Sequence, residues 1–95
     1  MKAGITITSQ PTAQTVNVGG TAVFKVTATG TGLTYQWQWR KNASSSWAST
    51  SVTGNKTATI TVSATTARNG YQYRCVITDA NGNVVNSDAV TLTVK

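Results

Sequence analysis

Residues 34–41 read Thr34-Tyr35-Gln36-Trp37-Gln38-Trp39-Arg40-Lys41, a stretch in which large apolar side chains alternate with polar ones. A repeat of two residues places Tyr35, Trp37 and Trp39 on one side of a strand and the intervening polar side chains on the other. Such a strand is typical of an antiparallel sheet that covers a core on one face and meets water on the other. We therefore predict a half-buried sheet around this stretch.

A second stretch, Tyr71 to Asp79, alternates in the same way. Its apolar face consists of Tyr71, Tyr73, Cys75 and Ile77. Further alternating stretches are residues 5–8, 14–18, 21–29, 47–50, 57–63 and 84–94. Turn signals separate them, among them Asn81-Gly82, a dipeptide that accepts positive φ at low cost. Seven or eight short strands with turns about every 8–12 residues predict a β-sandwich or a barrel.

The composition supports a single all-β domain. The chain has 95 residues, which suffice for one domain and leave little room for a deep active-site cleft. Threonine, whose branched Cβ favours strands, is abundant, whereas glutamate is absent. We interpret residues 1–95 as one domain, in which Met1 to Gly4 are an added start or a linker.

Several of these stretches together resemble the immunoglobulin superfamily over nearly the whole chain. The residues that carry the resemblance are Phe24 to Gly30, Trp37, Tyr73-Arg74-Cys75 and Leu92 to Val94. The resemblance implies a Greek-key β-sandwich of seven to eight strands, with a tryptophan on strand C and a Tyr-x-Cys motif on strand F. Val26 stands where the family has its strand-B cysteine, so we expect a sandwich without the inter-sheet disulfide.

The resemblance also implies a core and a closer relationship. Tyr73 is expected to supply the hydroxyl hydrogen bond that ties strand F to the preceding loop. Residues 35–39, Trp47 and residues 70–75 are similar to the tandem immunoglobulin-like repeats of bacterial secreted and cell-surface proteins. The expected core residues are Phe24, Val26, Trp37, Ile60, Tyr73, Cys75 and Leu92.

Catalytic and metal-binding residue types are scarce in this sequence. Histidine and glutamate are absent, and the acidic side chains are Asp79 and Asp88. Cys75 has no histidine to activate it as a nucleophile. Residues 79–83 are similar to the first half of a calcium loop, but the closing bidentate glutamate is missing. We expect a hairpin turn there, and we predict no enzyme activity, no cofactor and no metal site.

The polar and aromatic residues suggest two candidate binding regions. The formal net charge is +6, but the cations are scattered. The outer face of strands C and F would present amides and guanidinium groups, which suit polar or anionic ligands. Trp39 and Trp47 could stack on a sugar ring as an exposed pair, or instead close the end of the sandwich. The candidate binding residues are Arg40, Arg74, Gln36, Gln38, Trp39 and Trp47.

Two functions from different classes fit this sequence. In the first, the domain is a structural spacer or stalk repeat of a bacterial secreted or cell-surface protein, and its partners are the neighbouring domains. In the second, it is an adhesion or carbohydrate-binding module that contacts a glycan, a cell-wall polymer or a protein. We expect a monomer that neither binds nucleic acid nor inserts into a membrane. The fold does not decide between the two, because sites are grafted onto folds.

Overall fold

The two most strongly alternating stretches form the central strand pair of the protein. In the computed structural model, which describes residues 4–95, they become β5 (Thr34–Arg40) and β8 (Gln72–Thr78). The two strands are antiparallel, and Trp37 lies opposite Cys75 in the register. The inner face of the pair carries the buried side chains of Trp37 and Cys75. The residues next to them along each strand point to the outer face and are only partly buried.

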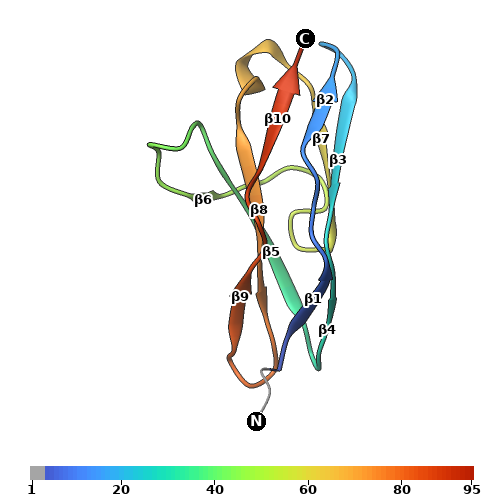
Figure 1. Cartoon of the computed structure of the whole chain (residues 1–95), viewed down its shortest axis with the longest axis vertical. Coiled ribbons are helices and arrows are strands. Elements are labelled where there is room, and N and C mark those ends of the chain that lie inside the picture. Colours follow the sequence, from blue (N-terminus) through green and yellow to red (C-terminus); the bar gives the residue numbers. More distant parts are fainter. Residues whose placement is uncertain (1–3) are drawn as a thin grey trace.

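The first sheet extends from this pair on both sides (Figure 1). Its strand order is β2-β10-β8-β5-β6, and β9 also pairs with β8. The β2 strand runs parallel to β10, and the other pairs are antiparallel. The added strands are β2 (Gln14–Val16), β6 (Ala48–Ser49), β9 (Val84–Asn86) and β10 (Val90–Val94).

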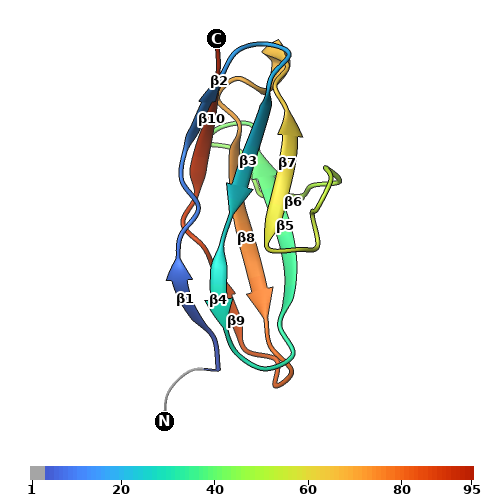
Figure 2. The ribbon, with the colours of Figure 1, turned by 90° about the vertical axis from the view of Figure 1, so that its right-hand side faces the viewer.

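The second layer lies across the core from the first and contains the remaining strands (Figure 2). Val26 alone separates β3 from β4, and its N–H donates to the carbonyl oxygen of Ala58 at 2.9 Å. The two labels therefore describe one strand, which pairs with β7 at one end and with β1 at the other. The bounds are β1 (Thr6–Ser9), β3 (Thr21–Lys25), β4 (Thr27–Thr29) and β7 (Thr59–Ser63).

Two interruptions, at Val26 and at Ser87, explain why ten strands are labelled where seven or eight are expected. Val26 divides the expected strand 21–29 into β3 and β4. The β1 and β2 strands match the separate expected stretches 5–8 and 14–18, and between them the chain changes layers at Pro11, which is buried and cannot donate to a ladder. The segment 84–94 breaks at Ser87, whose N–H donates to the carbonyl oxygen of Cys75 at 2.8 Å and whose Oγ accepts from the Cys75 N–H at 2.7 Å. The all-β sandwich and the absence of a disulfide are confirmed within the described residues, where Cys75 is free.

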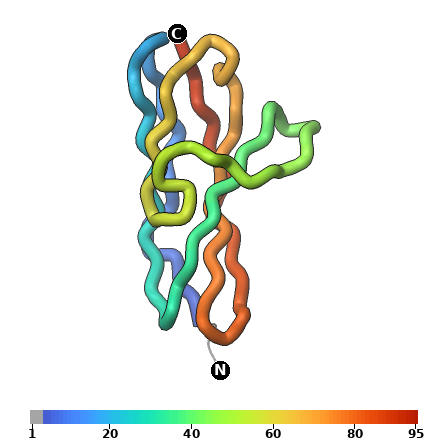
Figure 3. Tube along the Cα trace, turned by 180° about the vertical axis from the view of Figure 1, so that it is seen from behind, coloured from blue at the N-terminus to red at the C-terminus, as the bar shows by residue number. Residues whose placement is uncertain are grey.

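The connection from β6 to β7 is a strap instead of a strand. We use "strap" for residues 50–58, which cross from the first sheet to the second (Figure 3, yellow-green). Thr50 N–H donates to the carbonyl oxygen of Trp37 at 3.1 Å, and Trp37 N–H donates to that of Asn55 at 2.8 Å. At its far side a single bridge joins Thr53 to Thr61 of β7. This segment occupies the place of strand D in the ABED sheet of the seven-strand pattern.

The domain is elongated, with extents of 45 × 24 × 19 Å. The β1 strand begins near one end of the long axis, and the C-terminus lies at the other end (Figure 1). The hairpin of residues 41–47 projects from the side of the first sheet (Figures 1 and 3). Among residues 4–95, no helix is long and apolar enough to cross a membrane.

Candidate functional site

The outer face of β5 and β8 carries two matched pairs of side chains. Arg40 lies opposite Gln72 in the register, and its Nε donates to the Gln72 Oε1 at 2.6 Å. Arg74 lies opposite Gln38, and its Nε donates to the Gln38 Oε1 at 2.8 Å. Each glutamine thus holds one guanidinium group against the sheet. The two arginines are side by side because the strands are antiparallel and in register.

Trp47 lies over both guanidinium groups. The Arg40 Cζ is 4.4 Å from the centroid of the Trp47 ring, and the Arg74 Cζ is 4.5 Å from it. Both distances are within the range of a cation–π interaction. The residue reaches this position because the 41–47 hairpin returns the chain to β6 at the edge of β5. We call Gln38, Arg40, Trp47, Gln72 and Arg74 the arginine–tryptophan face.

Positive charge dominates the arginine–tryptophan face. Partial burial, and then the nearby charge of Arg40, lower the pKa of the Arg74 guanidinium from its usual value. An arginine nevertheless stays protonated at neutral pH. The acidic side chain of Asp79 belongs to the β8–β9 turn and not to this face. Gln36 shares the outer side of β5, but its amide donates to the Trp37 carbonyl oxygen at 2.9 Å instead of joining the two pairs.

The structure separates Trp39 from Trp47. Trp39 alternates with Arg40 along β5 and therefore lies on the inner side of the sheet. Its ring stacks on Tyr71, with centroids 4.9 Å apart and planes inclined by 27°. Trp47, by contrast, contacts the outer side. The two tryptophans form neither an exposed pair nor a joint seal at the end of the sandwich, which corrects both alternatives.

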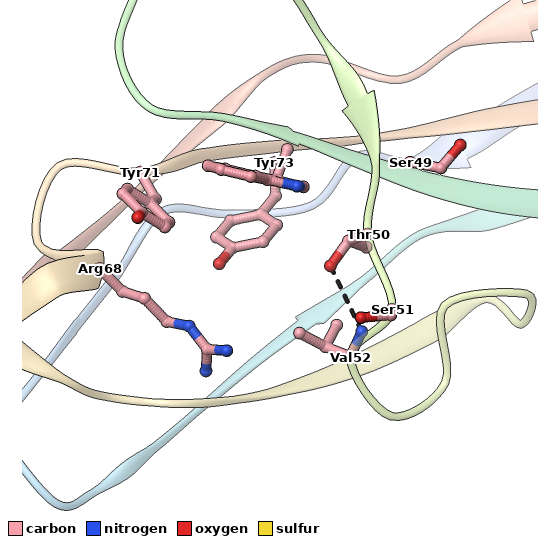
Figure 4. Close-up of a pocket in the computed structure, with 8 residues that line it drawn as sticks. Ser49, Thr50, Ser51, Val52, Arg68, Tyr71 and Tyr73 are labelled. Carbon is pink, nitrogen blue, oxygen red and sulfur yellow. Dashed lines mark hydrogen bonds between the residues drawn. The ribbon is translucent and has the colours of Figure 1, made fainter.

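Trp39 instead lines a pocket beside the strap (Figure 4). The pocket has a volume of about 270 Å³. Its walls come from the end of β5, the start of β8, the strap and the 3-10 turn η1 (Thr66–Arg68). The lining residues are Trp39, Ser49, Thr50, Ser51, Val52, Arg68, Tyr71 and Tyr73.

The residues expected to form the core are fully buried. Each of Phe24, Val26, Trp37, Ile60, Tyr73, Cys75 and Leu92 has a relative exposure of 1% or less. Phe24 and Tyr73 stack with centroids 5.2 Å apart. Burial raises the pKa of the Cys75 thiol to about 12, and a backbone hydrogen bond with Gln36 lowers it in part. A thiol with this pKa is almost wholly protonated at neutral pH and therefore unreactive.

The corner before β8 is tied down differently from the expected arrangement. The Tyr73 hydroxyl makes no hydrogen bond to another group in residues 4–95, and it points into the pocket (Figure 4). The tie is made instead by Asn69, whose Oδ1 accepts from the Val94 N–H at 3.0 Å. Gly70 N–H also donates to the Leu92 carbonyl oxygen at 2.8 Å. Tyr73 contributes its ring to the core and leaves its hydroxyl at the pocket.

Residues 79–83 form the expected turn. The Asp79 Oδ1 accepts from the N–H groups of Asn81 and Asn83, both at 2.9 Å, and its Oδ2 accepts from the Asn83 side-chain amide at 2.9 Å. The hydrogen bond from that amide, followed by those from the backbone, lowers the pKa of the carboxyl group. Within the described residues, no cluster of three potential metal ligands occurs. The carboxylate is thus used inside the turn.

Comparison with known proteins identifies this sandwich. The model of the immunoglobulin domain family matches residues 6–79. The chain belongs to the immunoglobulin domain family. No curated protein sequence matches this immunoglobulin domain.

Several solved structures share the fold. The titin domains z1z2 in complex with telethonin are 24% identical with a TM-score of 0.67, over 100% of this chain and 49% of that chain. The Ig1-2 module of the Drosophila receptor protein tyrosine phosphatase DLAR is 23% identical with a TM-score of 0.65, over 98% and 50%. Domain D1 of Duf (Kirre) is 17% identical with a TM-score of 0.67, over 97% of both chains.

These likenesses show the fold of the immunoglobulin domain. The domain spans about half the length of the titin and DLAR chains. It therefore resembles immunoglobulin modules of muscle and cell-surface proteins, and such domains are typically non-catalytic. Sequence reasoning found the arginines and glutamines of the arginine–tryptophan face from the alternation in β5 and β8, but not the position of Trp47 over them. It missed Arg68, Thr50 and Ser51, because no periodic pattern marks a pocket between a strap and a turn.

Proposed function

We propose that this immunoglobulin domain is a non-catalytic spacer in a longer secreted or cell-surface protein. The observation that carries the proposal is the position of the chain ends. The β1 strand begins near one end of a 45 Å long body, and the C-terminus lies at the other (Figure 1). Domains joined through such ends extend a chain instead of folding it back. Each added copy therefore lengthens the stalk by about one domain.

Two further observations support a repeated module. The titin and DLAR chains that the domain resembles are described as z1z2 and Ig1-2, and this chain spans about half of each. The outer sheet faces are rich in threonine and glutamine, which keep them soluble without a partner. A bacterial origin for the parent protein is part of the proposal. It is supported by the resemblance of residues 35–39 and 70–75 to bacterial repeats.

Small-angle scattering of two copies joined from Lys95 to Met1 tests the spacer. An extended pair has a maximum dimension of roughly 90 Å, twice the 45 Å extent of one domain. The single domain is the control for length. A pair whose maximum dimension stays close to that of one domain would show that the copies fold against each other, and would contradict the proposal.

A second function, weak binding of anionic glycans or wall polymers, is favoured by the arginine–tryptophan face. Arg40 and Arg74 each use Nε for a glutamine, and their Nη groups make no hydrogen bond within residues 4–95. Two guanidinium groups held side by side offer paired donors to sulfate, phosphate or carboxylate groups. Because the residues of this face are only partly buried, salt should weaken such binding over a Debye length of about 8 Å.

A binding screen against polyanionic and neutral glycans tests this second function. The Arg40→Ala, Arg74→Ala double variant should lose binding, whereas the Lys25→Ala, Lys56→Ala variant removes the same charge elsewhere and should keep most of it. Binding that both double variants lose equally would show a general charge effect and no site. If the wild type binds none of the glycans in the screen, the spacer is the better-supported function.

A further inference from the structure

The pocket beside the strap contains polar groups that the stability of the fold does not require. Tyr73 presents its hydroxyl to the pocket without a partner in residues 4–95, although phenylalanine would fill the same core space. Thr50 Oγ1 accepts the Val52 N–H at 3.3 Å, which leaves its own hydrogen free to donate (Figure 4). The Arg68 side chain lies across the opening from both (Figure 4). Three polar groups from three parts of the chain thus converge on one space.

Arg68 is held in place at this pocket. Its Nη1 donates to the carbonyl oxygen of Ser63 at 2.9 Å, at the end of β7. The remaining donors of the guanidinium group make no hydrogen bond within residues 4–95. The acidic side chains of the chain are Asp79 and Asp88, and neither lines the pocket. A fixed guanidinium without a carboxylate partner in the protein is suited to a carboxylate from outside.

The rest of the pocket suits a hydroxylated ring. Trp39, Tyr71 and Tyr73 form an aromatic wall on one side. Thr50 supplies a hydroxyl group on the other, where Ser49 and Ser51 also line the pocket, and Val52 adds an apolar contact. The volume of about 270 Å³ lies just below the range of drug-sized ligand sites, which begins near 300 Å³. A single small ring therefore matches the space better than an extended ligand does.

We propose that this pocket binds one carboxylate-bearing sugar ring, of the uronic acid type. Arg68 contacts the carboxylate, the aromatic wall packs against the apolar face of the ring, and the Thr50 and Tyr73 hydroxyls bond its hydroxyl groups. The pocket exists because the chain crosses as a strap where a strand D would close this side of the sandwich. The site is separate from the arginine–tryptophan face, on the other side of the β5 sheet. It does not depend on the spacer role.

The three tryptophans allow a test that reports the place of binding as well as its strength. In a ¹⁵N-labelled protein, each indole N–H gives its own signal: Trp39 reports the pocket, Trp47 the arginine–tryptophan face and Trp37 the core. The probes are glucuronic acid, glucose and acetate, each titrated to roughly 20 mM at constant salt. We expect glucuronic acid to shift the Trp39 signal in a saturable way. Glucose and acetate, which each lack half of the recognised groups, should shift it at least about tenfold more weakly.

Three variants assign the contacts. Arg68→Gln should weaken glucuronic acid binding about tenfold or more and remove the preference over glucose. Tyr73→Phe should weaken it about threefold at unchanged thermal stability, which keeps the test valid if Arg68→Gln unfolds. Lys25→Gln is the matched control, since it removes one positive charge from β3, outside both candidate binding sites, and should leave the titration unchanged.

Each contrary result would overturn the proposal. A shift of Trp47 without Trp39 would place the acid on the arginine–tryptophan face. Equal shifts with glucose would show that Arg68 does not recognise the carboxylate. Equal shifts with acetate would show a simple anion site that does not recognise the ring. An unmoved Trp39 signal at the highest glucuronic acid concentration would show that the pocket does not bind this sugar.

Discussion

Trp37 bonds the strap through three different groups while its ring lies in the core. Its ring is fully buried, and its indole Nε1 donates to the carbonyl oxygen of Thr57 at 2.7 Å. Its backbone N–H and carbonyl oxygen bond Asn55 and Thr50 in the strap. The residue therefore both fills the core and anchors the segment that crosses between the sheets. Trp47, in contrast, is half-buried and contacts the side chains of Arg40 and Arg74 on the outer face.

We expect Trp37→Ala to destabilise the domain far more than Trp47→Ala does. Truncation of a buried tryptophan costs about 3–5 kcal/mol, and here it also removes the indole hydrogen bond to the strap. Loss of exposed cation–π contacts costs roughly 1 kcal/mol. Urea unfolding of both variants beside the wild type measures the difference. Equal free-energy losses would show that the strap and the core do not depend on Trp37.

Cys75 offers a test of how the two sheets face each other. Val26 and Cys75 are both fully buried and come from opposite layers. In Val26→Cys, oxidation should form the bridge that most immunoglobulin domains have, and raise stability by roughly 2–4 kcal/mol. Mass spectrometry detects the disulfide, and unfolding without reductant measures the gain in stability.

In the wild type, Cys75 should react with a thiol reagent only after denaturation, because burial raises the pKa of its thiol to about 12. Fast labelling of the native wild type would contradict the burial.

At the scale of elements, the strap depends on one glycine. Gly54 has φ of +85°, and a Cβ there would collide with the carbonyl oxygen of Thr59. Gly82 in the β8–β9 turn has nearly the same φ, +84°, with nothing within 4 Å of a Cβ. Alanine substitutions at these two glycines therefore distinguish the cost of backbone strain, which both share, from the cost of a steric clash, which occurs only at position 54.

We expect Gly82→Ala to cost roughly 1–2 kcal/mol, which is the price of a left-handed alanine. Gly54→Ala should cost about 3 kcal/mol or more, because the strap must also move away from β7. Thermal unfolding of both variants measures the two costs. If they are equal, the strap adapts to a side chain at position 54 and is looser than its hydrogen bonds suggest.

The β8–β9 turn should make the domain sensitive to acid. Hydrogen bonds from Asn83 and the turn backbone lower the pKa of Asp79 from its ordinary value of 3.8. A carboxyl group whose pKa is lower in the folded state stabilises that state above its unfolded pKa, and this contribution is lost as the pH falls through the folded pKa. Stability should therefore decline below about pH 4.

Asp79→Asn should flatten this decline, since an asparagine cannot gain the proton. Asp88→Asn is the control, because the hydrogen bonds of Asp88 come from its backbone and its side chain is exposed. The midpoint of thermal unfolding between pH 5 and pH 2 measures the effect. A wild-type and an Asp79→Asn curve with the same slope would show that the turn bonds do not depend on the charge.

At the scale of the whole molecule, charge opposes folding. Eight cations face two carboxylate side chains, and the formal net charge is +6. Like charges gathered on a compact body repel one another, and salt screens them. Raising sodium chloride from about 10 mM to about 150 mM should increase the midpoint of thermal unfolding by roughly 2–4 °C. A decrease would mean that attractive pairs, such as the turn around Asp79, dominate the electrostatics.

The sequence predicted the strands well and the candidate sites in part. Alternation places Trp37, Tyr73 and Leu92 inside because period two is imposed by the strand itself. The same rule predicted that Arg40 and Arg74 share the outer face. It could not predict that Trp47 lies on them, because that position depends on how a hairpin folds back. Nor could it predict that the Tyr73 hydroxyl faces a pocket, because alternation fixes the side of a sheet and not the neighbour of an atom.

By itself, the sequence determined the all-β sandwich, its core and the lack of a disulfide, since these follow from local periodicity and from a single cysteine. Only the tertiary structure decided which distant segments meet. It placed Trp39 and Trp47 on opposite sides of one sheet, and it brought Arg68, Thr50 and Tyr73 to one pocket. The physical reason is that loop paths are set by backbone hydrogen bonds to other strands, such as those between the strap and Trp37. Such bonds leave no repeating pattern along the chain.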